Sequence, residues 1–172
     1  MEENQPKTGK FALNFGLILG AISVVFGVML FSLDMHYSQD WTIGIINLAI
    51  TIAVLAVGIV QFKKANNGFI TLPEALKVGV GAAAIAAVIA LIYGAILANV
   101  IDPDFVDKAM EARFSEPVAN GTMTSEEAQQ AMEAGKSFFW IGYPIQLIVA
   151  VFLGFIISLI VGLVVKKQKP EY

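Results

Sequence analysis

The chain has 172 residues, of which 57% are hydrophobic and 15% are charged, and its formal net charge is −3. Soluble domains carry about 25% charged residues, so this composition excludes a protein that folds in water behind a polar surface. The absence of cysteine excludes disulfides, thiolate metal sites and a cysteine nucleophile. Since the chain has no basic stripe with interleaved aromatic residues, we expect no nucleic-acid partner.

Four apolar runs are long enough to cross a membrane, because each exceeds about 18 residues. They cover residues 11–33, 41–62, 78–101 and 138–165. The first is longer than the apolar core of a signal peptide and lacks a cleavage site, so we interpret it as a retained helix. The last must tilt or kink, and Pro144 offers a kink. The sequence predicts a single all-α, polytopic membrane domain with a bundle of four transmembrane helices.

Two capping boxes predict helix starts. Thr71 is followed three residues later by Glu74, and Thr124 is followed in the same way by Glu127. In this motif the threonine accepts a hydrogen bond from the backbone of the glutamate, and the glutamate accepts one in return. We therefore expect the third membrane helix to begin near Thr71 and a short helix to begin near Thr124.

Residues 102–136 form the one sizeable segment between spans. We interpret it as a short extracytoplasmic helical insert, with an earlier helix over 103–114 that Pro117, Asn120 and Gly121 separate from the next helix. Asp102 is interpreted as a helix cap. The insert is predicted to be a helical hairpin that lies over the bundle.

Lysine and arginine are distributed unequally between the two ends of the spans. The two tails and the second connection hold eight of them: Lys7, Lys10, Lys63, Lys64, Lys77, Lys166, Lys167 and Lys169. The first and third connections hold three, Lys108, Arg113 and Lys136. The positive-inside rule then predicts that both termini lie in the cytoplasm.

No Asp, Glu, Lys, Arg or His lies inside any of the four spans. Proton relays and ion-coupling sites are built from those side chains, so this absence argues against a proton-coupled carrier. The neutral polar residues that remain are Asn14, Asn47, Thr51, Asn99 and Gln146, of which Asn47, Thr51 and Gln146 are the candidates for a polar site. Asn47 and Thr51 share a helix face. Such side chains either form hydrogen bonds between helices or bind a polar headgroup or substrate.

Small residues form two stripes. The first helix carries Gly16, Gly20, Ser23 and Gly27, and the last carries Ala150, Gly154, Ser158 and Gly162. Small faces allow helix backbones to approach closely in lipid. The two interpretations are packing within the bundle and a face that binds another membrane protein or a second copy of the chain.

A weak internal repeat relates the two halves of the chain. Lys10 precedes Gly27 by the same spacing that separates Lys77 from Gly94. Two helical hairpins related by an axis along the membrane normal would produce this pattern. Chance similarity between apolar helices explains it equally well.

The one histidine, His36, is expected in a short, exposed outer turn with Asp34 and Asp40. A single imidazole without other histidines or cysteines is a weak match to any zinc geometry. The motifs of metalloproteases, serine hydrolases, P-loop enzymes and kinases are absent. We therefore expect no catalytic residue, no metal and no cofactor.

The predicted cytoplasmic connection is basic. Lys63, Lys64 and Lys77 flank its loop-forming residues. Each lysine near an anionic membrane surface contributes about 1 kcal/mol of attraction. The segment therefore either binds lipid headgroups or a cytoplasmic partner, or serves only to orient the chain.

Three segments carry a resemblance to a known family. They are the opening Lys10-Phe11-Ala12-Leu13-Asn14-Phe15-Gly16-Leu17, the loop Gln61-Phe62-Lys63-Lys64-Ala65-Asn66-Asn67-Gly68-Phe69, and Leu72-Pro73-Glu74-Ala75-Leu76-Lys77-Val78-Gly79. With the acidic insert before the last helix, they resemble the bacterial integral-membrane proteins of "domain of unknown function 4199". The resemblance implies four helices and an inner-membrane location, and it implies no activity.

Three classes of function remain. We favour a non-enzymatic accessory or scaffold subunit of the inner membrane, which associates with another membrane protein, with itself or with membrane lipids. The alternative is a small-molecule or lipid-carrier translocator that works as an oligomer. A membrane enzyme ranks third, because an enzyme needs a positioned acid, base, nucleophile or metal.

Overall fold

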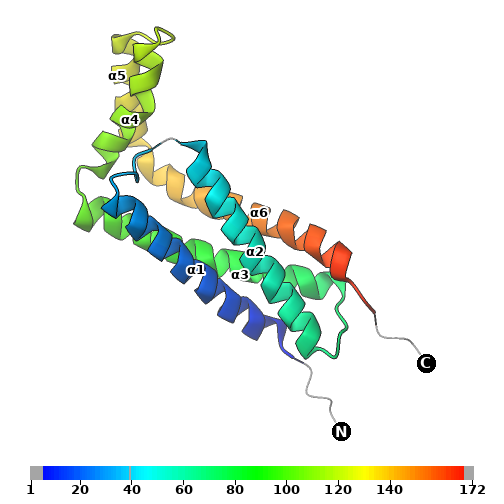
Figure 1. Ribbon diagram of the computed structural model, residues 1–172. Coiled ribbons are helices and arrows are strands. Elements are labelled where there is room, and N and C mark those ends of the chain that lie inside the picture. The colour runs from blue at the N-terminus through cyan, green and yellow to red at the C-terminus, as the bar shows by residue number, and fades with distance from the viewer. Residues whose placement is uncertain (1–5, 39, 169–172) are drawn as a thin grey trace.

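Four long helices form the body of the protein, and a helical hairpin projects from one end (Figure 1). The structure is a computed structural model and describes residues 6–38 and 40–168. The elements are α1 (Thr8–Ser32), α2 (Trp41–Ala65), α3 (Leu72–Ile96), the π-helical turn η1 (Leu97–Ile101), α4 (Phe105–Ala119), α5 (Ser125–Ser137), the 3-10 turn η2 (Phe139–Ile141) and α6 (Gly142–Val165). Helices α1, α2, α3 with η1, and η2 with α6 are long and apolar enough to span a membrane. The prediction of an all-α, four-span protein is confirmed.

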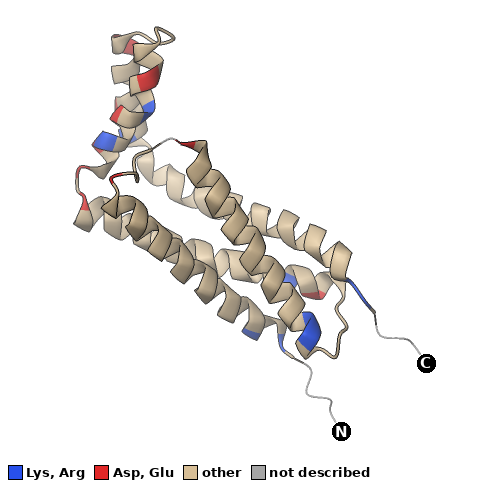
Figure 2. Cartoon of the chain, viewed as in Figure 1, with Lys and Arg blue, Asp and Glu red and all other residues tan. Residues whose placement is uncertain are grey.

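Charge distinguishes the two ends of the bundle. Both ends of the described chain lie at one end with the α2–α3 connection, and Figure 2 shows lysines gathered there. We call this the basic end. The opposite end, from which α4 and α5 project, is the hairpin end, and it carries both acidic and basic residues.

Local sequence signals set several helix boundaries. The Thr71 side chain accepts from the Glu74 backbone, and the Glu74 carboxylate accepts from the Thr71 backbone. Thr124 and Glu127 make the same reciprocal pair. Both predicted capping boxes are confirmed. They satisfy backbone N–H groups that have no partner within the first turn of a helix.

One helix end differs from the predictions. Helix α4 continues to Ala119 with Pro117 inside it, so the expected end near residue 114 and the expected break at this proline are wrong. The chain turns at Asn120 and Gly121, as expected, and φ at Gly121 is +75°, a value that glycine adopts without a Cβ clash. In the last span, the change from 3-10 to α-helix comes just before Pro144, whose ring nitrogen cannot donate to the preceding turn.

Helix α3 is the centre of the bundle, with α1 on one side and α6 on the other. A Cβ added at Gly16 would lie 2.7 Å from the Cβ of Ile85, and one added at Gly20 would lie 2.5 Å from Cδ1 of Ile89. On the other side, Gly154 is in direct contact with Ala83. Most of both small-residue stripes therefore packs within the chain.

The core lies between the middle of the bundle and its basic end. The α2 residues Leu55, Ile59 and Phe62 are almost fully buried. None of the residues of α2 from Trp41 to Val54 is buried. Helix α2 therefore packs closely only over the half nearer the basic end, and this leaves space beside it near the hairpin end.

Replacing Gly154 with alanine tests the α3–α6 contact. The new methyl group would overlap the Cβ of Ala83, which cannot rotate away, so we expect a loss of about 1–3 kcal/mol in the free energy of unfolding. Gly94 is the matched control, because nothing lies within 4 Å of a Cβ added there. Thermal unfolding in detergent measures both variants. Equal stability of Gly154→Ala and Gly94→Ala would contradict this packing.

Candidate functional site

A cavity lies beside α2, where this helix separates from the rest of the bundle. Its volume is about 280 Å³, and it is lined by residues of α1, α2, α3 and α6. The volume is just below the usual range of ligand sites, about 300–1,000 Å³. Alanines of α3 form much of its wall: Ala83, Ala86, Ala87 and Ala90. Because these side chains are small, the space between the helices is not filled.

Three of the neutral polar residues expected within the membrane line this cavity. Asn47 and Thr51 come from α2, and Gln146 comes from α6. The Thr51 hydroxyl donates to the backbone carbonyl of Asn47 at 2.9 Å. Within the described residues, the side-chain amides of Asn47 and Gln146 have no hydrogen-bond partner in the protein. The structure thus places these amides around a shared space, without the hydrogen bond between helices that was one of the two interpretations.

The small-residue stripes also contribute to the cavity. Ser23 and Ala150 line it, and the Ser23 hydroxyl donates to the Leu19 carbonyl at 2.9 Å. Gly27, Ser158 and Gly162 instead contact side chains or backbone of α3. Two stripe positions, Ser23 and Ala150, therefore lie at the cavity wall, and the other positions pack against α3.

A second pocket, of about 540 Å³, lies where the hairpin meets α6. Its lining includes Arg113 of α4, the aromatic side chains of Phe138, Phe139 and Tyr143, and Gln146. Gln146 lines both the cavity and this pocket. The cavity and the pocket therefore share Gln146 as a lining residue.

Asp102 is the centre of a polar cluster at the hairpin end. Its carboxylate accepts a hydrogen bond from the Tyr37 hydroxyl. It lies 3.5 Å from Nε2 of His36 and 3.1 Å from Nζ of Lys108. The π-helical turn η1 orients Asp102, whose backbone N–H donates to the Leu97 carbonyl at 2.8 Å. The cluster joins the α1–α2 connection to the α3–α4 junction.

Two predictions about this cluster are wrong. His36 was expected in an exposed turn, but its side chain is 6% exposed and packs between the rings of Phe31 and Tyr37. Asp102 was expected to cap a helix, but the residue before α4 is Asp104, which makes no side-chain cap. The pairing of His36 with Asp102 spans 66 positions. No local pattern in the sequence indicates it.

The electrostatics of the cluster favour charged Asp102 and charged Lys108. Hydrogen bonding from Tyr37, with further contributions from Lys108 and His36, holds the pKa of Asp102 below its usual value. The hydrogen bond to Asp102 raises the pKa of Lys108. Burial and the Asp102 carboxylate raise the pKa of Tyr37. Among the described residues, no group of three or more His, Cys, Asp or Glu side chains lies close enough to hold a metal.

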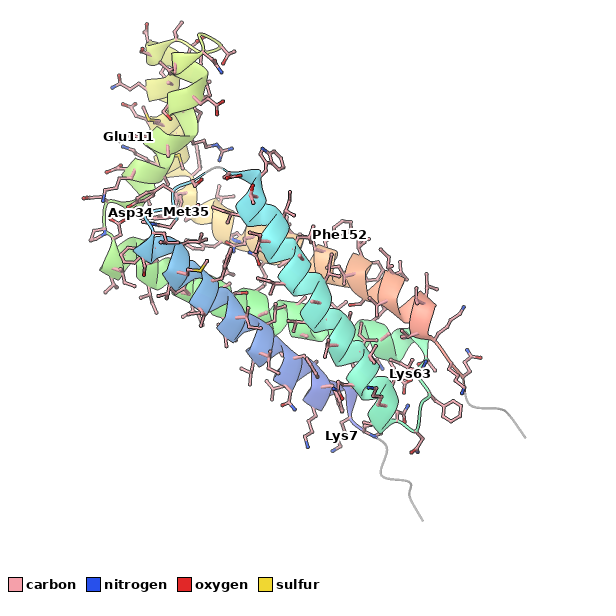
Figure 3. The ribbon with its side chains drawn as sticks, viewed as in Figure 1. Lys7, Asp34, Met35, Lys63, Glu111 and Phe152 are labelled. Atoms are coloured by element: carbon pink, nitrogen blue, oxygen red, sulfur yellow. The ribbon has the colours of Figure 1, made fainter. Side chains whose placement is uncertain are left out.

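At the basic end, part of the basic connection is held by the end of the last helix. The Lys63 ammonium donates to the Val165 carbonyl at 2.8 Å (Figure 3). Ile70 and Lys167 exchange two backbone hydrogen bonds of 2.9 Å. Lys63 therefore satisfies a carbonyl at the C-terminus of α6. Lys64 and Lys77 are exposed.

Replacing Asp102 with asparagine tests the cluster. In the wild type, the lowered pKa means that Asp102 stabilises the fold fully above its ordinary value of 3.8, and that this is lost as pH falls through the lowered value. We expect Asp102→Asn to unfold at a lower temperature and to lose this acid dependence. Asp104→Asn is the control, because Asp104 is 75% exposed. The prediction fails if thermal unfolding of both variants follows the wild type across the acid range.

Comparison with known proteins places the chain in a family without assigning it an activity. A family model described as "Protein of unknown function (DUF4199)" matches residues 14–167. No curated protein and no solved structure matches the chain. The matched region begins within α1 and extends beyond α6, so it contains all but the first residues of the four-span bundle together with the hairpin. The chain belongs to the DUF4199 family.

Proposed function

We propose that this protein is a non-enzymatic accessory subunit of the bacterial inner membrane that binds an amphiphilic lipid in the cavity beside α2. The observation that carries the proposal is the arrangement of Asn47, Thr51 and Gln146 around one space within the apolar bundle. The same space is otherwise walled by apolar and small side chains. Such a wall suits a hydrocarbon chain, and the amides suit the polar atoms of a headgroup or its linkage.

The energetic support comes from the unpaired amides. A polar group without a hydrogen-bond partner in an apolar medium costs several kcal/mol. Asn47 and Gln146 have no such partner among the described residues of the protein. A bound lipid whose ester or hydroxyl groups reached these amides would remove much of this cost. The amides would then select lipids that carry polar atoms at that depth.

Charge supports an orientation in which both termini are cytoplasmic. The lysines at the basic end would face the cytoplasm according to the positive-inside rule (Figure 2). The hairpin would lie outside, and the cavity would open into the outer leaflet. The exposed Lys64 and Lys77 would lie at the inner surface, where they suit anionic headgroups or a cytoplasmic partner.

The alternative function is a small-molecule or lipid-carrier translocator that works as an oligomer. Translocation would need a path past the basic end of the bundle. Phe62, Ile70 and Val78 are almost fully buried together there, and the Lys63 contact with Val165 joins α2 to α6. This packing favours binding over transport. Enzymatic turnover is disfavoured by the absence of ionisable side chains from the spans.

Filling the cavity should displace the lipid. Gly44 lines the cavity, and a Cβ added there meets nothing within 4 Å, so Gly44→Leu should fold normally while it occupies the binding space. We expect native mass spectrometry to show an amphiphile retained by the wild type after mild detergent extraction, and much less by Gly44→Leu. Gly94→Leu is the matched control, because Gly94 also has open space and does not line the cavity. Retention of no amphiphile by the wild type, or equal retention by all three proteins, would overturn the proposal.

The proposed orientation has its own test. Reporter fusions after the C-terminus should give a cytoplasmic signal, and reporter insertions at Gly121 should give a periplasmic one, because of the unequal lysine distribution. Gly121 lies in the exposed turn between α4 and α5, where an insertion should not disturb the bundle. The reverse pair of signals would invert the orientation and place the cavity in the inner leaflet.

A further inference from the structure

We infer that the lipid bound beside α2 is anionic, and that Arg113 in the pocket at the base of the hairpin pairs with its headgroup; this inference rests on the proposed function. Arg113 is the one charged side chain among the described residues that line the pocket. Its neighbours there are mainly aromatic and small. An arginine in such surroundings presents a planar set of donors that matches a phosphate group.

The pairing of charges on the hairpin singles out Arg113. Lys108 lies 3.1 Å from Asp102, and Lys136 lies 2.6 Å from Asp107. Arg113 has no ion pair or hydrogen bond from its side chain within the described part of the chain, although α4 and α5 carry many carboxylates. Its guanidinium is therefore the cation of the hairpin that remains available for an external anion.

The position of Gln146 between the two spaces determines how a lipid that occupied both would lie. Gln146 lines both the pocket and the cavity. The cavity lies farther from the hairpin, within the bundle. A lipid with its headgroup at Arg113 would therefore pass Gln146 and place a chain against the α3 alanines. Tyr143 and Trp140, near the start of α6, are of the residue types that concentrate at membrane interfaces, which suits a headgroup at this level.

The acidic residues of the hairpin argue for a membrane lipid over a free anion. Glu111 and Glu116 are exposed on α4, the helix that carries Arg113 (Figure 3 labels Glu111). They would repel an anion that approached from water and was held only by charge. A lipid chain in the cavity adds apolar burial at about 0.8 kcal/mol per CH₂ group. The anionic head would then be held beside Arg113 despite the surrounding carboxylates.

Competition between two lipids with identical chains tests the inference. Purified protein is incubated in mixed micelles with equal amounts of palmitoyl-oleoyl phosphatidylglycerol, which is anionic, and palmitoyl-oleoyl phosphatidylcholine, which has no net charge. Native mass spectrometry then measures the ratio of the two lipids retained by the folded protein. We expect the wild type to favour phosphatidylglycerol by roughly fivefold, the effect of one basic side chain near a headgroup. Arg113→Gln should bring the ratio close to one, and Arg113→Lys should keep a preference.

Lys136→Gln is the matched control, because it removes the same charge from the same hairpin but Lys136 does not line the pocket. Equal loss of preference in Arg113→Gln and Lys136→Gln would overturn the role of Arg113 in favour of general surface charge. If Arg113→Gln does not fold, loss of the preference in folded Arg113→Lys overturns the inference, and its survival supports it. Equal retention of both lipids by the wild type, with Gly44→Leu still displacing them, overturns the anionic preference alone. No retention of either lipid by the wild type overturns the proposed function as well.

Discussion

The close approach of α3 to both α1 and α6 is the constraint on which the rest of the structure depends. Glycines from α1 and α6 meet the surface of α3, and Gly79 of α3 in turn meets Ser158 of α6. In lipid, no hydrophobic effect drives helices together, so dispersion contacts over short interhelical distances supply much of the association energy. Helices α1, α3 and α6 thereby form a closely packed layer. This layer is the frame against which α2 and the hairpin are placed.

Helix α2 packs less closely against the bundle, because the small-residue faces of α3 are already in contact with α1 and α6. Its large buried residues, Leu55, Ile59 and Phe62, all lie in the half nearer the basic end. There, the hydrogen bond from Lys63 to Val165 joins α2 to the end of α6, and the Ile70–Lys167 bridge joins the α2–α3 connection to the residues that follow α6. Toward the hairpin end, the facing side chains of α3 are alanines, which are too short to fill the gap. The cavity and its polar lining thus result from the close packing of α2 at the basic end and its looser packing toward the hairpin end.

The Asp102 cluster closes the hairpin end at a different place, between the α1–α2 connection and the start of α4. It packs His36 and Tyr37 under Phe105 and uses Lys108 to pair the carboxylate. A search of the sequence for catalytic or metal-binding residues would select His36 and Asp102. In the structure, both serve to join these two segments of the chain. Arg113, on the same hairpin, is not part of it, and its position beside the start of α6 joins the hairpin to the cavity in the proposed binding role.

The sequence by itself determined the four spans, the all-α class, the family and both capping boxes, because hydrophobic length and capping depend on residues near one another in the chain. It also indicated that Asn47, Thr51 and Gln146 were the polar groups to follow. Only the tertiary structure decided that Gln146 meets Asn47 across a cavity and that His36 is buried against Asp102. The internal repeat stays a prediction. The physical reason is that the spans are apolar on all sides, so composition alone does not show which face of a helix meets a neighbour. That choice depends on how closely small residues let particular backbones approach, and on which gaps their neighbours then leave unfilled.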